Sequence, residues 1–397
     1  MKKNLHFPQP SGSYKIGKMH LNFVDAQRID PFPPAAGKNR DIPIMIWYPA
    51  DNTGTTTPSY YIQQADNINL STFNLGFKLM FSKLWKIKTN SYEGIPVSMK
   101  EDKFPVILFN HGFTSFMEQN TSQMEHLASH GYIVVSISHP YDGVASYPDG
   151  RSIPMDTSKM ENITKEKRKK MRKDAKRMRN LLNRLQERNL SFEEIEDLTQ
   201  KFLFSEDEGT MEIWVDDVIF ILNQLELLNS GEIKSIFRGK LDIAQRVGVF
   251  GHSFGGGTSI LTPCIDDRIT CGINMDGGIW PGLKEKYVYK KPYMFMENGG
   301  NRGMNRYFYE VNQHDSYMVC VEDALHFDFS DTSLFGKNWL MKRTKIVGKI
   351  HHKRMQNFMN GLITAFFDRY IKKIKAPLLD QDAYEGIVIE KKFSRVP

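Results

Sequence analysis

One short segment in the second half of the chain restricts its possible folds more than any other. Residues 247–256 read Val-Gly-Val-Phe-Gly-His-Ser-Phe-Gly-Gly, and the residues that follow, Gly-Thr-Ser-Ile-Leu, can begin a helix. An apolar run, a serine between glycines and a helix start are typical of a buried parallel strand that turns sharply into a helix. The glycines allow strained backbone angles at Ser253 and leave its hydroxyl exposed above the sheet edge. This context predicts an α/β protein with Ser253 as a nucleophile.

Strands and helices are predicted to alternate on both sides of this segment. The predicted strands are residues 14–25, 41–48, 104–109, 131–137, 241–250, 270–275, 293–296 and 317–321. Such alternation indicates a mostly parallel central sheet flanked by helices, with the two earliest strands antiparallel. Charged, helical sequence at 159–229 interrupts the pattern, and residues 355–374 are predicted to form a terminal helix. Without a low-complexity linker, we expect one domain over 1–397 that contains 159–229 as a helical insertion.

The sequence shows no sign of a membrane span, a secretion signal, a disulfide framework or a zinc site. The chain has 397 residues, and no apolar run approaches the roughly 18 residues of a membrane span. Its first eight residues lack the apolar stretch of a secretion signal, so a cytoplasmic location is expected, with room for peripheral membrane contact. The three cysteines have no metal-binding spacing, so neither a disulfide framework nor a zinc site is predicted. Two of them lie in apolar, strand-like runs and are expected in the core: Cys271 and Cys320.

A serine nucleophile needs a base to accept its proton and an acid to orient that base. Where a serine lies in this kind of turn, the acid and then the histidine follow it in the chain. His326 comes directly after the predicted strand at 317–321, at the sheet edge where the turn also lies, and is predicted to be the base. The other histidines after Ser253 precede that strand or lie on a charged helix surface: His314, His351 and His352.

The sequence leaves two carboxylates open for the acid. Asp276 ends a predicted strand and is followed by two glycines, which form a turn that can expose it. Glu297 follows the next strand and occupies the more usual place for the acid. Asp328 and Asp331 are near His326 in sequence, but we expect both on the loop surface.

Two backbone N–H groups are predicted to bind an oxyanion. Phe254 begins the helix after the turn, so its N–H lies free at a helix start. The second donor is expected in the loop after the third strand, which opens with Asn-His-Gly-Phe at 110–113. The N–H of Phe113 is therefore the candidate.

Segments along most of the chain resemble the plasma-type platelet-activating factor acetylhydrolases, also called lipoprotein-associated phospholipases. They are Ser-Tyr-Lys-Ile-Gly at 13–17, Trp-Tyr-Pro at 47–49, Asn-His-Gly-Phe at 110–113, Leu-Ala-Ser-His-Gly-Tyr-Ile-Val at 127–134, Gly-His-Ser-Phe-Gly-Gly at 251–256, Cys-Gly-Ile-Asn-Met-Asp at 271–276 and Leu-His-Phe-Asp-Phe at 325–329. Many hydrolases share the motif around Ser253, so the matches outside it point to this family.

The resemblance implies an α/β-hydrolase fold and a metal-independent serine esterase without an organic cofactor. It implies that an acyl-enzyme on Ser253 forms from the acyl ester of platelet-activating-factor-like or oxidised phospholipids. It also favours Asp276 over Glu297 as the acid. The implied nucleophile, acid, base and two oxyanion donors are Ser253, Asp276, His326, Phe113 and Phe254, in that order.

One departure puts the acyl pocket in question. Animal members carry bulky residues directly after the acid, where this chain has Gly277 and Gly278. A general carboxylesterase or polyester hydrolase is therefore the first alternative. A catalytically silent hydrolase fold that serves as a binding protein is the second, because a fold alone does not determine function.

Two helical segments are candidates for surface contacts. In residues 73–88 an apolar stripe opposes lysines and predicts either a lipid-interface helix, as the resemblance favours, or a helix that covers the core. The stripe consists of Phe73, Phe77, Met80, Phe81, Leu84 and Ile87. Residues 165–188 are strongly basic with one apolar face, which predicts a solvated basic helix or, second, attraction to anionic lipid. Interleaved aromatic residues are missing from this segment, so no nucleic-acid partner is expected.

Overall fold

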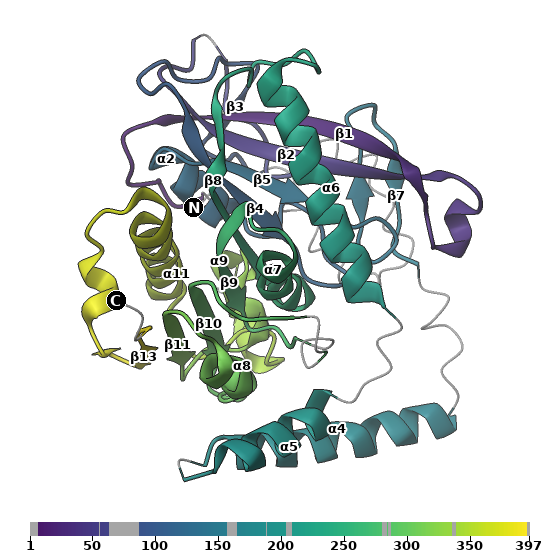
Figure 1. The fold of residues 1–397 in the computed structure, drawn as a ribbon, viewed down its shortest axis with the longest axis vertical. Coiled ribbons are helices and arrows are strands. Elements are labelled where there is room, and N and C mark those ends of the chain that lie inside the picture. The colour runs from purple at the N-terminus through teal and green to yellow at the C-terminus, as the bar shows by residue number, and fades with distance from the viewer. Residues whose placement is uncertain are drawn as a thin grey trace.

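The computed structural model describes residues 7–54, 56–62, 87–156, 165–187, 189–203, 209–279, 284, 287–335 and 339–394. A central sheet with helices on both faces dominates these residues (Figure 1). Within the described ranges, no helix is long and apolar enough to cross a membrane.

Six neighbouring strands at the centre of the sheet are parallel. In spatial order they are β5 (Ile133–Ile137), β4 (Phe104–Asn110), β8 (Leu241–His252), β9 (Ile269–Met275), β10 (Tyr293–Asn298) and β11 (Ser316–Val321). Most of their residues are buried, as is typical of parallel strands covered by helices on both faces. The carboxyl ends of these strands meet along one edge of the sheet, where the predicted site residues follow them.

Antiparallel strands extend the sheet at both ends. At one end, β1 (Lys15–Ile29) pairs with β2 (Asn39–Ala50), as predicted, and β2 pairs with β5. The short strand β3 (Ser91–Glu93) runs parallel to β1 at this edge. At the other end, β13 (Ile387–Lys392) and β12 (Ala383–Tyr384) extend β11 in antiparallel fashion and were not predicted. With them, the sheet has eleven strands among the described residues.

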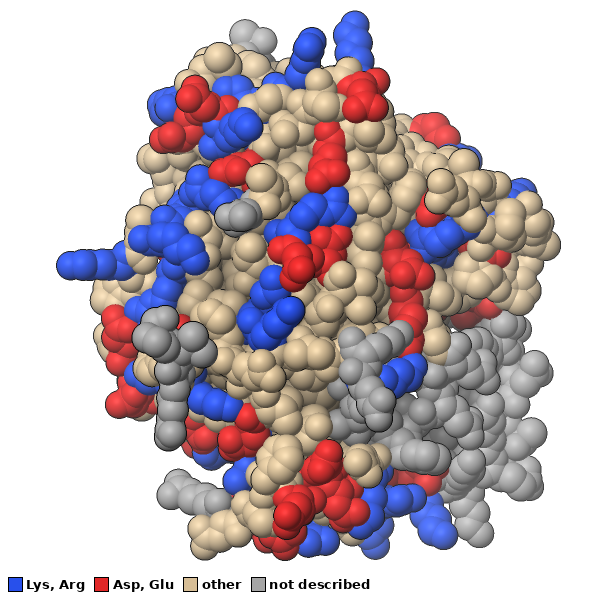
Figure 2. Space-filling view, viewed as in Figure 1, with Lys and Arg blue, Asp and Glu red and all other residues tan. Residues whose placement is uncertain are grey.

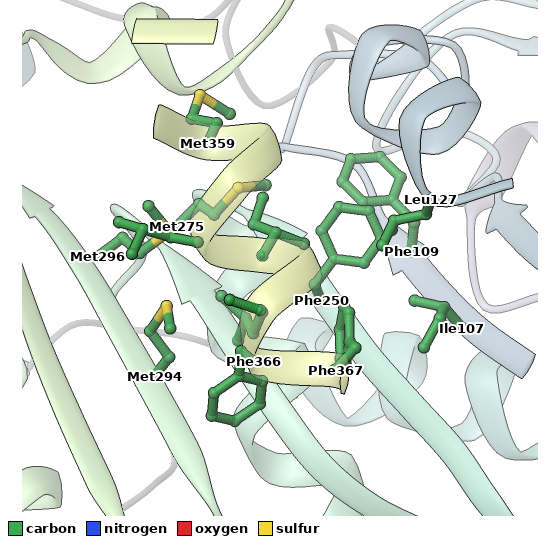
Figure 3. Close-up of a cluster of buried hydrophobic side chains, with 14 of the residues drawn as sticks. Ile107, Phe109, Leu127, Phe250, Met275, Met294, Met296, Met359, Phe366 and Phe367 are labelled. Carbon is green, nitrogen blue, oxygen red and sulfur yellow. The ribbon is translucent and has the colours of Figure 1, made fainter. Parts of the chain in front are cut away.

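Alternate residues of the central strands point to opposite faces and build two cores. Ile107 and Phe109 of β4 face α2 (Thr121–Ser129) and α11 (His352–Phe367), together with Phe250 and several methionines (Figure 3). Val106 and Leu108 face the other side and pack with α6 (Thr210–Ser230). Helix α7 (Phe254–Ile265), which begins directly after Ser253, lies beside α6 (Figure 1).

The predicted insertion at 159–229 contains two kinds of helix. Its last helix, α6, is largely apolar and packs on the sheet, as the crossover helix that leads into β8 does in such folds. The first two, α4 (Lys165–Leu185) and α5 (Phe192–Leu203), pack against each other at the margin of the molecule (Figure 1). Their apolar residues cluster around Leu185 and contact Tyr307. The organisation as one domain with an insertion stays a prediction.

Charge on the α4–α5 pair is divided between its helices. Lys173, Lys176 and Arg177 of α4 are exposed, whereas Leu182 and Leu185 are buried, so the apolar face of α4 packs inward as predicted. The neighbouring α5 begins with exposed glutamates. Figure 2 shows Lys and Arg interspersed with Asp and Glu over the described part of the viewed face.

Shorter elements complete the chain. They are η1 (Pro33–Ala35), β6 (Ala145–Ser146), β7 (Ser152–Ile153), α8 (Arg306–Val311), η3 (His326–Phe329), α9 (Thr332–Phe335), α10 (Trp339–Arg343), η4 (Asp368–Lys372) and η5 (Pro377–Asp380). Cys271 and Cys320 are buried, as predicted, and the three cysteines are free thiols.

Candidate active site

Ser253 lies between the end of β8 and the start of α7, on the turn that its sequence predicts. Its backbone angles are φ 57° and ψ −123°, in a region that residues with a side chain rarely occupy. Such strain persists only where the surroundings enforce it. Here the Ser253 N–H donates to the Met275 carbonyl at 2.8 Å, while the Gly256 N–H donates to the Ser253 carbonyl at 2.9 Å.

Glycines at this turn permit a very close approach of three backbone segments. A Cβ atom at Gly255 would lie 2.3 Å from the carbonyl oxygens of both Asn110, the last residue of β4, and His111, the first of the loop that follows. A Cβ atom at Gly277 would lie 1.9 Å from the Ser253 carbonyl oxygen. No side chain fits at either position without backbone movement, so the glycine after Asp276 has a packing reason in this chain.

The structure brings Ser253, His326 and Asp276 into one hydrogen-bonded row. His326 Nε2 is 2.9 Å from Ser253 Oγ, and His326 Nδ1 is 2.6 Å from Asp276 Oδ2. The His326 side chain is 36% exposed, whereas the Asp276 side chain is completely buried. The imidazole can therefore meet a substrate while the carboxylate stays shielded from water.

Further donors surround the Asp276 carboxylate. The Asn298 N–H donates to Oδ1 at 2.9 Å, and the side-chain amides of Asn298 and Asn301 donate to Oδ2 at 2.7 and 3.1 Å. Burial by itself raises the pKa of Asp276, but the hydrogen bonds from His326 and Asn298 outweigh it and lower this pKa below its ordinary value. Asp276 is therefore ionised at neutral pH. Sequence reasoning missed both asparagines because Asn298 ends β10 and Asn301 follows it, and this strand does not carry the acid.

Glu297 does not contact His326. Its two carboxylate oxygens accept hydrogen bonds from the backbone N–H groups of Gly303 and Asn305 at 2.7 and 2.8 Å. It thus holds the loop after β10 in place. Burial raises the pKa of Glu297 to about 7.

The prediction that Asp328 and Asp331 lie on the loop surface is wrong. Asp328 is 2% exposed and accepts the N–H groups of Leu325 and Gly348, so it secures the loop that carries His326. Asp331 is completely buried and accepts the N–H of Ser122 at the start of α2. Asp328 thus supplies an acceptor for backbone amides around the irregular loop, and Asp331 supplies one for the first turn of α2, which the sequence alone did not reveal.

Hydrogen bonds fix the orientation of the peptide unit that joins Gly112 to Phe113 in the loop after β4. The His139 N–H donates to His111 Nε2 at 3.1 Å, so the other ring nitrogen of His111 carries the proton and donates to the Gly112 carbonyl at 2.8 Å. The Ser115 N–H donates to the same carbonyl. Because peptide units are trans, the N–H of Phe113 points in the opposite direction from this carbonyl.

The two predicted oxyanion donors come from adjacent elements. Phe254 is the first residue of α7, where helix amides have no intrahelical acceptor. The Phe113 and Phe254 rings are 6.0 Å apart between centroids. A Cβ atom at Gly112 would lie 3.3 Å from Ser253 Cβ, so the loop after β4 touches the turn at Ser253.

Two aromatic side chains near these groups are exposed to an unusual extent for their size. Phe113 is 40% exposed, and Phe327, which directly follows His326, is 48% exposed. The surroundings of the serine therefore offer apolar surface on both of these loops. Sequence reasoning named only the backbone of Phe113 and missed Phe327, although its position next to the base was a usable signal.

The predicted lipid-interface stripe lies almost entirely outside the described residues. Of its members only Ile87 is described, and this residue is buried. The stripe at 73–88 therefore stays a prediction. Among the described residues, no group of three or more His, Cys, Asp or Glu side chains could hold a metal ion.

Comparison with known proteins gives a consistent set of relatives. The family model described as "Platelet-activating factor acetylhydrolase, isoform II" matches residues 1–382. A platelet-activating factor acetylhydrolase from Cavia porcellus is 26% identical over 348 residues, which are 84% of this chain and 70% of that protein. One from Bos taurus is 23% identical over 409 aligned positions, covering 98% of this chain and 82% of that protein.

A solved structure supports the architecture over nearly the whole chain. It is titled "Ferulic acid esterase from Streptomyces cinnamoneus", has a TM-score of 0.72 and covers 97% of this chain and 99% of its own. At 20% identity this similarity concerns the fold alone. The predicted α/β-hydrolase fold, a mostly parallel sheet with helices on both faces, is confirmed.

Proposed function

This chain belongs to the platelet-activating factor acetylhydrolase isoform II family, and we propose that it cleaves carboxylic esters through an acyl-enzyme on Ser253. The observation that carries the proposal is the row from Ser253 Oγ through His326 to Asp276 Oδ2, with separations of 2.9 and 2.6 Å. A hydroxyl needs such a base to act as a nucleophile at neutral pH, and the base needs an orienting acid.

The proposed reaction has two halves. His326 Nε2 accepts the proton of Ser253 as the serine oxygen attacks the ester carbonyl, and the N–H groups of Phe113 and Phe254 stabilise the oxyanion. His326 then gives this proton to the leaving alcohol, which departs and leaves the acyl group on Ser253. In the second half His326 takes a proton from water as the water oxygen attacks the acyl carbonyl. The bond between the acyl carbon and Ser253 Oγ then breaks, His326 returns the proton to Ser253, and the carboxylic acid leaves. Asp276 holds the imidazole tautomer and balances its charge throughout.

For the substrate, we propose the acyl ester of platelet-activating-factor-like or oxidised phospholipids. The names of the Cavia porcellus and Bos taurus relatives support this class. The exposed rings of Phe113 and Phe327 suit an apolar acyl chain near the serine. A lipid surface is then the expected partner. A general carboxylesterase with the same row of residues is the alternative.

Labelling with a fluorophosphonate probe tests the nucleophile. Wild-type protein should be labelled and should hydrolyse esters, and Ser253→Ala should lose both properties without a change in melting temperature. His326→Ala should lose turnover as well, and the double variant should be little worse than either single one, because these residues act as a unit. Undiminished hydrolysis by Ser253→Ala would exclude the mechanism, and an unlabelled, inactive wild type would favour a silent binding protein.

A panel of esters with increasing acyl length tests the substrate class. Each ester is offered as a soluble monomer and within phospholipid vesicles. Preference for phospholipid esters in vesicles is expected. Equal turnover of unrelated soluble esters, with no gain in vesicles, would favour the general carboxylesterase.

A further inference from the structure

Three hydrogen bonds in series join the loop after β4 to the residue that carries the imidazole base. The Gly112 N–H donates to Gln119 Oε1 at 2.7 Å. Gln119 Nε2 is 2.6 Å from His252 Nδ1, and His252 Nε2 is 2.9 Å from the His326 carbonyl oxygen. Gln119 and His252 are 6% and 1% exposed, so water has little access to compete for these bonds.

The two ends of this series determine the direction of every bond. The Gly112 N–H can only donate, so Gln119 presents its oxygen to it and its amide N–H to His252. The His326 carbonyl can only accept, so the proton of His252 is on Nε2 and its Nδ1 accepts from Gln119. One arrangement of protons therefore satisfies all three bonds. Burial lowers the pKa of His252 to about 3, which keeps this neutral form present across the physiological range.

Gln119 is itself firmly placed. Its N–H donates to the Phe116 carbonyl, and its own carbonyl accepts the N–H of Asp331 at 3.0 Å. Space at the centre of the bridge is tight, because a Cβ atom at Gly112 would lie 3.2 Å from His252 Nδ1. Small shifts of either side chain would thus reach the peptide unit that carries the Phe113 N–H.

We propose that Gln119 and His252 are positioning residues, which hold the oxyanion donor at Phe113 and the base His326 at a fixed separation. Neither residue contacts the Ser253 hydroxyl. Gln119 acts through the backbone of the loop after β4. His252 acts through the His326 carbonyl and through its ring, whose centroid is 4.6 Å from that of the His326 ring. The inference rests on the proposed function, since it assigns the residues that keep the oxyanion donor and the base of that same site in position. Its physical basis is that small displacements of catalytic groups lower turnover steeply.

Gln119→Met tests the bridge, because methionine has a similar length and none of the polar atoms. We expect kcat for a soluble ester to fall about tenfold with KM nearly unchanged, since two buried hydrogen bonds are lost and the site loosens. Gln123→Met is the matched control. Gln123 lies four residues further along, in α2, and is also buried. Its side chain accepts from Asn120 and donates to Gln356 and Asn360, away from the site. Its variant should lower the melting temperature similarly and keep the wild-type kcat.

Two replacements of His252 separate hydrogen bonding from packing. His252→Gln keeps an N–H that can reach the His326 carbonyl, whereas His252→Phe keeps the ring volume and loses both bonds. A positioning role predicts a higher kcat for the glutamine variant than for the phenylalanine variant. The opposite ranking is expected if the ring only fills space, and it would overturn the proposal.

The outcomes distinguish this proposal from the proposed function. If Ser253→Ala stays active, the function itself fails. If Ser253→Ala is inactive and Gln119→Met turns over like the wild type, only the bridge fails. A kcat loss in Gln123→Met as large as that in Gln119→Met would likewise overturn the bridge, because the effect would then follow from general loosening of α2 and the turn before it.

Discussion

At the residue scale, the site depends on two carboxylates with different surroundings. Asp276 is ionised and bonds to His326, whereas Glu297 bonds to a neighbouring loop instead. Asp276 has φ 57° just beyond the end of β9, so it leaves the strand alternation and meets His326. Glu297 lies at the neighbouring position on β10 and turns to the loop at 303–305. Two acidic residues on adjacent strands thus have separate tasks.

Exchange of each carboxylate for its amide is expected to affect turnover very differently. Asp276→Asn should lower kcat on the order of 10⁴-fold, because the amide favours the wrong tautomer of His326. Glu297→Gln should change kcat only slightly, since its oxygens contact backbone N–H groups and not the imidazole. Steady-state kinetics with a soluble ester checks both, and the reverse ranking would transfer the orienting role to Glu297.

Glu297 also makes the stability of the protein depend on pH. Its pKa is about 7 in the folded protein because of burial, against an ordinary value of 4.5. The folded state therefore holds a proton that the unfolded state has released, so stability falls as pH rises from about 4.5 to 7 and levels off above. The whole effect is at most about 3 kcal/mol, at 1.36 kcal/mol per pKa unit.

Thermal unfolding of wild type and Glu297→Gln between pH 5 and 8 measures this effect. The variant has no titrating group at this position, so its melting temperature relative to wild type should rise with pH. A difference that is constant across the range would contradict the assignment of the raised pKa to Glu297.

At the element scale, the turn at Ser253 requires β8, α7 and the turn after β9 to approach one another so closely that their backbones touch. Gly277 is the position where this approach is closest, at 1.9 Å for an added Cβ atom. A side chain directly after the acid would therefore collide with the Ser253 carbonyl in this fold.

Gly277→Ala should displace either Ser253 or Asp276. We expect destabilisation of about 1–3 kcal/mol from overpacking, together with a marked loss of kcat. Gly361→Ala in α11 is the control, because its added Cβ would meet only the flexible end of Leu378 at 3.0 Å and alanine favours the helix. Wild-type turnover and stability in Gly277→Ala would show that the turn can move without consequence.

At the scale of the whole molecule, the parallel sheet gathers groups that are far apart in sequence. Adjacent strands β4, β8, β9, β10 and β11 lead to Phe113, Ser253, Asp276, Asn298 and His326, respectively. Ligand sites of such sheets form at the carboxyl ends of the strands, and here each strand contributes one part. The antiparallel strands at both ends add no residue to this row.

The predicted lipid stripe at 73–88 concerns the molecule as a whole, because it would orient the site toward a membrane. If the stripe contacts lipid, Phe77→Asp with Phe81→Asp should leave thermal stability and turnover of a soluble ester unchanged and reduce vesicle binding. If it covers the core, the same pair should bury unpaired charge and lower stability by several kcal/mol. Calorimetry and vesicle sedimentation distinguish the two, and a destabilised protein would exclude lipid contact.

Local features of this protein could be predicted from sequence because their causes are local. The strand, the glycines and the helix start around Ser253 are neighbours in the chain, and their sterics alone produce the turn. The central parallel strands were predicted for the same reason, since each is a short apolar run bounded by turn residues. His326 could be chosen as the base because it follows a strand on the side where the turn lies.

Other features were decided only by the tertiary structure. Residue types did not separate Asp276 from Glu297, because the difference is which backbone N–H groups surround each carboxylate. Asp328 and Asp331 are polar and sit in a loop, yet both are buried because that loop needs acceptors for its own amides and for those of α2. The Gln119–His252 bridge spans 133 positions of the chain. Contacts of this kind form only once the strands are packed, when burial makes each unpaired polar group costly and so selects its partner.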